Sequence, residues 1–174
     1  GPLAGVPIGV KDIIDSGDLP TEYGSGIYAG RRPYVDAPVV ARLRSAGAIL
    51  LGKTVTTEFA LLEPSKTKNP HDASRTPGGS SSGSAAAVAA GMVPLALGTQ
   101  TNGSVIRPAA FCGVYGFKPS RGLIARTGML SLSRALDQPG LFARTLEDIA
   151  LLGDCAIGYD AGDADMRYHA GADL

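Results

Sequence analysis

Residues 6–14 read Val-Pro-Ile-Gly-Val-Lys-Asp-Ile-Ile, a mostly apolar run with a lysine and an aspartate near its end. Such a run is typical of a buried β-strand. Further along, Asp36 as N-cap, Pro38 in the first turn and Gly47 at the end delimit a short predicted helix. Residues 48–51 read Ala-Ile-Leu-Leu and predict a second buried strand. The order strand, helix, strand predicts a βαβ unit and hence an α/β fold with a parallel sheet.

Later segments add further predicted elements to this unit. A helix is expected over residues 85–90, where alanine dominates, and a third strand over residues 95–98. Residues 113–118 predict a fourth strand. Thr145 and Asp148 have the spacing of a capping box that opens a last helix.

Composition narrows the class of protein. The 174 residues hold 16 Lys and Arg against 16 Asp and Glu, and this zero net charge argues against a nucleic-acid partner. Cys112 and Cys155 are too few for a disulfide scaffold or a zinc site. No apolar run reaches the roughly 18 residues that span a bilayer, and the first residues lack a basic signal start. We therefore expect a cytoplasmic protein without a membrane partner, and a single domain over residues 1–174 that reads as cut at both ends.

A Gly/Ser-rich segment, Gly-Gly-Ser-Ser-Ser-Gly-Ser at residues 78–84, directly precedes the Ala-rich helix. Taken alone, such a run is more often a flexible loop than a catalytic one. Its position in front of a helix N-terminus, however, favours negative charge there. The segment also fits Gly-x-Ser-x-Gly, which would make Ser81 the nucleophile of an α/β-hydrolase. Against that interpretation, no buried strand precedes it and only His169 lies downstream.

A second polar turn, Thr-Asn-Gly-Ser at residues 101–104, follows the third predicted strand. Successive backbone N–H groups can converge in such a turn, so Ser104 is a candidate nucleophile. Because histidine is nearly absent, its base must be another residue, and Lys11 within the first strand is the natural candidate. Lys11 could instead extend its amine from an edge strand to solvent or pair with Asp12, and Lys53 at the end of another strand could compete for the role.

Several motifs, in order, resemble the amidase signature family. The separation between Ser80 and Ser104 also matches the separation of that family's two catalytic serines. The resemblance extends from the first strand to about residue 158, and it is carried by residues 9–12, 77–85, 98–108, 111–119 and 136–148.

The resemblance implies a mixed, mostly parallel sheet covered by helices, and hydrolysis of a carboxamide by a serine, a second serine and a lysine. Ser104 would be the nucleophile, Ser80 the bridging serine after a cis peptide bond, and Lys11 the base. Substrate would be a small-molecule amide, with neither a metal nor an organic cofactor. The oxyanion would be held by backbone N–H groups, with Ser81 supporting the network by hydrogen bonding; the donors would be Thr101, Asn102, Gly103 and Ser104.

Three features leave alternatives open. Gln100 and Asn102 stand where the family usually has Asp and Gly, which counts against the amidase subunit of a glutamine-dependent tRNA amidotransferase. Arg107 could clamp a substrate carboxylate, although an internal ion pair with Asp137 is favoured. Family members are longer at both ends, so an inactive scaffold remnant is a further alternative. Strand edges left exposed in such a segment favour a homo-oligomer.

Overall fold

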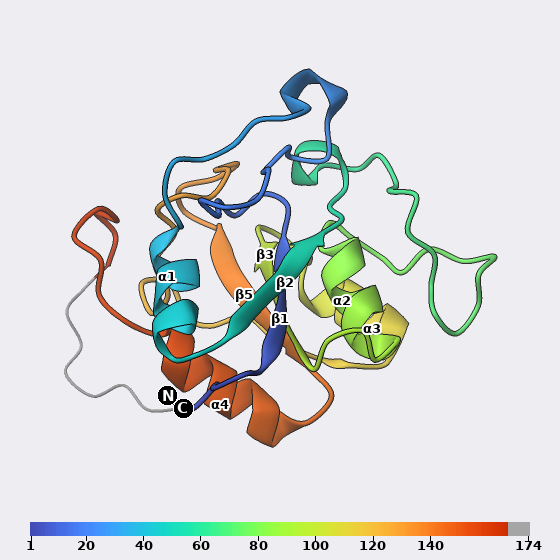
Figure 1. The fold of residues 1–174 in the computed structure, drawn as a ribbon. Helices are drawn as coiled ribbons and strands as arrows, with labels where there is room; N and C mark the ends of the chain where they lie inside the picture. The colour runs from blue at the N-terminus through green and yellow to red at the C-terminus, as the bar shows by residue number, and fades with distance from the viewer. Residues whose placement is uncertain (167–174) are drawn as a thin grey trace.

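A computed structural model describes residues 1–166, which are built around a five-stranded sheet in the order β2–β1–β3–β5–β4 (Figure 1). β1 pairs in parallel with β2 and with β3, whereas β5 runs antiparallel to β3 and to β4. All the strands except β5 therefore share one direction, which confirms the mixed, mostly parallel sheet. The strands are β1 (Pro7–Lys11), β2 (Ile49–Thr54), β3 (Leu95–Gln100), β4 (Tyr115–Phe117) and β5 (Gln138–Ala143).

Helices cover both faces of the sheet (Figure 1). On one face, α1 packs against α4, and α4 packs against β5 and β4. On the other face, α2 packs against β1, β3 and α3. Short 3-10 turns at Gly26–Tyr28 and Glu58–Ala60 lie in the connecting loops. The α-helices are α1 (Pro38–Ser45), α2 (Ser82–Ala89), α3 (Ile106–Cys112) and α4 (Leu146–Ala156).

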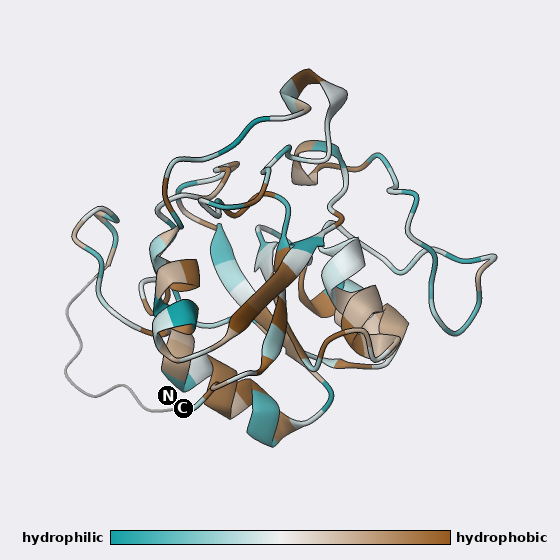
Figure 2. Ribbon diagram, in the orientation of Figure 1, coloured by the Kyte–Doolittle hydropathy of each residue, from teal (hydrophilic) through white to brown (hydrophobic). Residues whose placement is uncertain are grey.

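The alternation of side chains along each strand divides the core into two clusters. Ile8, Val10 and Leu97 belong to the cluster under α1 and α4, whereas Ala96 and Phe142 belong to the cluster under α2 and α3. Successive strand residues point to opposite faces of a sheet, so both faces of the central strands are buried. Figure 2 accordingly shows hydrophobic residues concentrated in the sheet and in the helices beside it.

The βαβ unit is confirmed, with two corrections of detail. Asp36 is not the N-cap of α1, because its Oδ1 accepts the Gly17 N–H at 2.8 Å while Ala37 takes the cap position. The strand predicted at residues 48–51 is not buried throughout. It is the edge strand β2, in which Ile49 and Leu51 are more than half exposed.

Two elements, α3 and β5, were absent from the sequence-based prediction. Pro108 lies in the first turn of α3, where the N–H groups lack intrahelical partners and a proline is tolerated. β5 begins Gln-Pro-Gly, which reads as a turn, yet Pro139 pairs with Thr99 inside the sheet. Pairing of these residues with β3 thus overrides the local preference.

The last predicted helix is confirmed as α4. Its N-cap is Thr145, whose hydroxyl accepts the Asp148 N–H at 3.1 Å. His169, which the α/β-hydrolase alternative would require, lies outside the described residues. Among the residues up to 166, no helix is both long enough and apolar enough to cross a membrane.

We expect Leu97→Ala to lower the free energy of unfolding by about 2–5 kcal/mol, because Leu97 is fully buried in the central strand β3. Urea unfolding followed by circular dichroism measures the change. Leu62→Ala is the matched control, since the Leu62 side chain is 89% exposed, and we expect it to change stability by less than about 0.5 kcal/mol. Equal losses in the two variants would contradict the assignment of the core.

Candidate active site

Three segments that are distant in the sequence meet at one edge of the sheet. β1 ends at Lys11 and β3 ends at Gln100, and because the two strands are parallel both ends lie at the same edge. α2 follows β2, which runs parallel to β1, so the N-terminus of α2 comes to this edge as well. The Gly/Ser-rich segment and the turn after β3 are thereby brought beside Lys11. Ligand sites in open α/β sheets typically form at this edge.

The Lys11 amine makes two hydrogen bonds inside the protein. Its Nζ lies 2.7 Å from Ser80 Oγ and 2.8 Å from Thr99 Oγ1, and the lysine has no exposed surface. The peptide bond between Gly79 and Ser80 is cis, as the family resemblance implies. Sequence reasoning therefore identified a lysine and a serine that are in direct contact.

Ser104 lies at the same place. It shares with Ser80 a pocket of about 10 Å³. Both hydroxyl-bearing and apolar side chains line this pocket. Its remaining lining residues are Ile13, Ala60, Thr99, Thr101, Met129, Leu130, Leu132 and Asp137.

The other serines of the segment hold α2 on the sheet. The Ser81 hydroxyl is fully buried, donates to Thr99 O at 3.1 Å and accepts the Thr99 N–H at 3.2 Å. A Cβ on Gly98 would lie 2.8 Å from Ser81 Oγ, so glycine allows this close approach. Ser84 Oγ donates to Leu97 O in the same way. With its hydroxyl buried and bonded to β3, Ser81 is not exposed as an elbow nucleophile would be.

The turn that carries Ser104 is closed by Gln100. Its Oε1 accepts the N–H groups of Val105 at 2.9 Å and Ile106 at 3.0 Å, and so caps the start of α3. The Ser104 carbonyl accepts the Ser81 N–H at 3.3 Å. By contrast, the backbone N–H groups of residues 102–104 donate to no group among residues 1–166. Gln100 thus supports the turn without a charge.

Burial sets the electrostatics of Lys11. It lowers the pKa of Lys11 well below the ordinary value, and the Asp137 carboxylate partly opposes this by raising it. A buried ammonium is costly when its neighbours are hydroxyl groups rather than a carboxylate in contact. The structure therefore favours the neutral amine, which is the form that can accept a proton.

The two candidate lysines at this edge, Lys11 and Lys53, contact different groups. Lys53 Nζ donates to Ile14 O and to Thr21 Oγ1, both at 2.6 Å, and lies 3.6 Å from Asp12. Burial lowers the pKa of Lys53 to about 8, and Asp12 opposes that shift. Asp12 thus pairs with Lys53 and not with Lys11. Lys53 braces the loop beyond β1 instead of lining the pocket.

Asp137 is the residue whose place the sequence did not indicate. The expected ion pair with Arg107 is wrong, because the carboxylate is taken up by other donors: the Thr101 hydroxyl and the backbone N–H groups of Leu132 and Ser133. Arg107 is exposed on α3, and its guanidinium lies beside Gly103, where an added Cβ would be 3.1 Å from Nη2.

A fold of this kind, with a buried lysine and two serines at the carboxyl edge of a mostly parallel sheet, defines the chain as an α/β protein with a serine–lysine site. The sequence model of the amidase family matches residues 1–172. The chain therefore belongs to the amidase family. Its relatives in that family are hydrolases that act on C–N bonds.

Individual relatives agree with this assignment. A glutamyl-tRNA(Gln) amidotransferase subunit of Chloroflexus aggregans is 48% identical over 168 residues, which are 93% of this chain and 34% of that protein. The native peptide amidase of Stenotrophomonas maltophilia superposes with a TM-score of 0.93 at 40% identity, over 99% of this chain and 37% of the amidase. A 6-aminohexanoate cyclic dimer hydrolase superposes with a TM-score of 0.91 at 39% identity, over 99% of this chain and 38% of the hydrolase. The chain thus spans about a third of the length of the curated relatives it matches.

The lowered pKa of Lys11 predicts a pH-dependent stability. Unfolding returns Lys11 to an ordinary pKa near 10.5, so between the two values the unfolded chain binds one more proton than the folded one. The Lys11 contribution to the free energy of unfolding should then rise by about 1.4 kcal/mol per pH unit in that window. Urea unfolding of wild type and Lys11→Met from about pH 7 to about pH 9 measures it: the stability of wild type relative to the variant should increase with pH.

Lys66→Met controls for the loss of a lysine, because Lys66 is exposed in a loop. Its stability should follow that of wild type at each pH. If the difference in free energy of unfolding between wild type and Lys11→Met stays constant over this pH range, the buried, neutral amine is contradicted.

Proposed function

We propose that this protein hydrolyses the C–N bond of a carboxamide through an acyl-enzyme on Ser104, with Ser80 as the bridging serine and Lys11 as the base. The observation that carries the proposal is the 2.7 Å contact between the buried Lys11 Nζ and Ser80 Oγ, in a pocket that Ser104 also lines. The described strands form one sheet, which supports treating residues 1–174 as a single domain.

In the first step, the neutral Lys11 amine takes the proton of Ser80 while Ser80 takes that of Ser104. Ser104 Oγ attacks the amide carbonyl carbon, and the carbonyl oxygen becomes an oxyanion. The free N–H groups of residues 102–104, together with that of Thr101, would hold the oxyanion. Such donors act where charge develops, in a site from which water is largely excluded.

In the second step, the C–N bond breaks and the proton returns through Ser80 to the leaving nitrogen, which departs as ammonia or an amine. Water then attacks the acyl ester, gives its proton to the relay, and releases the carboxylic acid and free Ser104. Arg107, exposed beside Gly103, would bind an anionic group on the substrate. The names of relatives, a peptide amidase and a cyclic dimer hydrolase, support amide chemistry.

A second candidate is the amidase subunit of a tRNA amidotransferase, which is favoured by relatives of that name at 48–49% identity. The neutral Gln100 and the side chain at Asn102 count against it. The candidates differ in behaviour: an independent amidase should release ammonia or an amine from simple carboxamides by itself. The subunit should act on glutamine only when partner subunits are added.

We expect a fluorophosphonate to label the wild-type chain at Ser104, as located by mass spectrometry of the modified peptide. Ser104→Ala should abolish the labelling, and Lys11→Ala should slow it by about 10²–10⁴-fold, because it removes the general base. Ser74→Ala is the control, since Ser74 is exposed, hydrogen-bonded to Asp72 and not among the residues that line the pocket.

Labelling of another serine, or unchanged labelling in Lys11→Ala, would overturn the assigned roles. No labelling of a folded wild-type sample would favour an inactive scaffold instead.

A further inference from the structure

The Asp137 carboxylate connects the nucleophile turn to the segment that covers the pocket. Its Oδ1 accepts the hydroxyl of Thr101 at 2.5 Å, and Thr101 is the first residue of the turn that carries Ser104. Its Oδ2 accepts the N–H groups of Leu132 and Ser133, both at 2.7 Å, and the Ser131 hydroxyl at 3.3 Å. The residue is 3% exposed, so these four donors replace its hydration.

We propose that Asp137 is a positioning residue for the amidase reaction, holding the Ser104 turn against residues 129–133, which cover the pocket. The inference rests on the proposed function, because it assigns a role within that reaction. Met129, Leu130 and Leu132 all line the pocket that Ser80 and Ser104 also line. The Asp137 carboxylate thus fixes the position of the backbone of the covering segment relative to the Ser104 turn.

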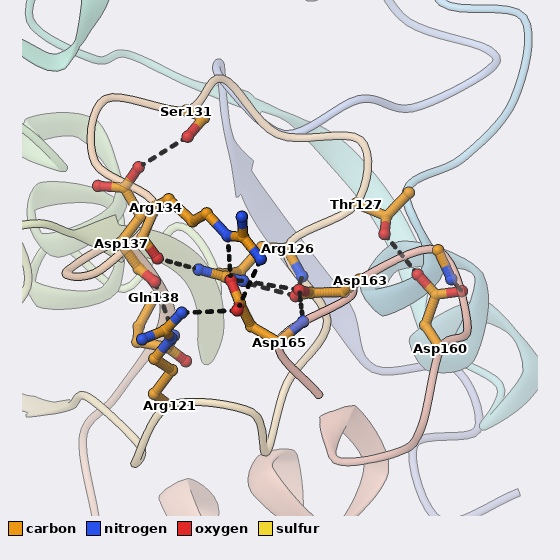
Figure 3. Close-up of polar contacts among 11 residues, drawn as sticks. Arg121, Arg126, Thr127, Ser131, Arg134, Asp137, Gln138, Asp160, Asp163 and Asp165 are labelled. Carbon is orange, nitrogen blue, oxygen red and sulfur yellow. Dashed lines mark hydrogen bonds and ion pairs between the residues drawn. The ribbon is translucent and has the colours of Figure 1, made fainter. Parts of the chain in front are cut away.

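Ion pairs hold the residues on either side of the covering segment (Figure 3). Arg126 binds Asp163 and Asp165 at 2.6 Å each, and Arg134 binds Asp165 at 3.1 Å. These pairs fix the flanks of the segment, whereas Asp137 ties the segment itself to the turn. Asp163 is therefore a matched control, because it holds a flank of the same segment through Arg126 and not through Thr101.

The charge of Asp137 has a second effect, on Lys11. It raises the pKa of Lys11 against the larger effect of burial. Other elements beside Lys11 supply little charge: β3 and α2 contain no titratable side chain. On β2, Lys53 is directed to Ile14, Thr21 and Asp12, and Asp12 itself also accepts the Glu22 N–H. Removing the Asp137 charge should therefore lower the pKa of Lys11 further, so that the amine stays neutral to lower pH.

A purely structural role for Asp137 would change stability and rate but not this titration. The test is the second-order rate of fluorophosphonate labelling at Ser104 as a function of pH, in the full chain. Wild type, Asp137→Asn, Thr101→Val and Asp163→Asn are compared, with circular dichroism to verify folding. Asp137→Asn keeps the size of the side chain but removes its charge and one acceptor oxygen.

We expect Asp137→Asn to slow labelling by about 10²-fold, because the turn loses its tether, and to move the acid limb of the pH profile to lower pH. Thr101→Val should slow labelling by about 10-fold with the limb unmoved, because it removes one bond to the carboxylate and no charge. Asp163→Asn should leave the limb unmoved and slow labelling less than Asp137→Asn does.

The inference is overturned if Asp137→Asn labels like wild type with the same limb, or if Asp163→Asn reproduces both of its effects. If Asp137→Asn does not fold, Thr101→Val decides, and an unchanged labelling rate in that variant overturns the tether. Absence of labelling in wild type would instead contradict the proposed function, so the two failures are distinguishable.

Discussion

The desolvation of one lysine amine is the constraint on which the site depends. Lys11 Nζ is enclosed at the end of β1 with hydroxyl oxygens as its hydrogen-bond partners, so the surrounding structure penalises its charged form. That enclosure requires β3 on one side and the start of α2 in front, and both are held there by the serines of the Gly/Ser-rich segment. The basicity of the amine is therefore a property of the whole carboxyl edge of the sheet.

One short segment makes two kinds of contact because its serines bind different partners. Ser80 contacts the Lys11 amine, whereas Ser81 and Ser84 bind the β3 backbone and seat the helix on the sheet. The low-complexity appearance of the segment, which suggests a flexible loop, results from a steric requirement. Small side chains and glycine are needed where a helix start approaches a strand within contact distance, as at Gly98. Composition alone cannot separate this case from a linker, whereas the position of the segment directly before a helix can.

Much of the fold was predictable from local patterns, and the parts that were not share a physical cause. The βαβ unit, the strand at 95–98 and the α4 cap follow from apolar periodicity and capping residues, and all are present. The contact of Lys11 with Ser80 also agrees with prediction, although it came from a family resemblance as much as from chemistry. β5 and α3 were missed because Pro139, Gly140 and Pro108 signal turns locally. Pairing with β3 overrides that signal in β5. Pro108 is tolerated because it lies in the first turn of α3.

The sequence-based analysis missed β5 and the position of Asp137 for the same reason. Asp137 immediately precedes β5, and only the antiparallel insertion of β5 between β3 and β4 brings it to the end of β3, where Gln100 pairs with Gln138. Without that strand, nothing in the sequence places Asp137 beside the Ser104 turn, and an internal ion pair with Arg107 was expected instead. In the structure, the Asp137 carboxylate instead accepts hydrogen bonds from a hydroxyl of the Ser104 turn and from backbone N–H groups of the covering segment. Long-range pairing thus decides which acid reaches the site, and sequence spacing carries no record of it.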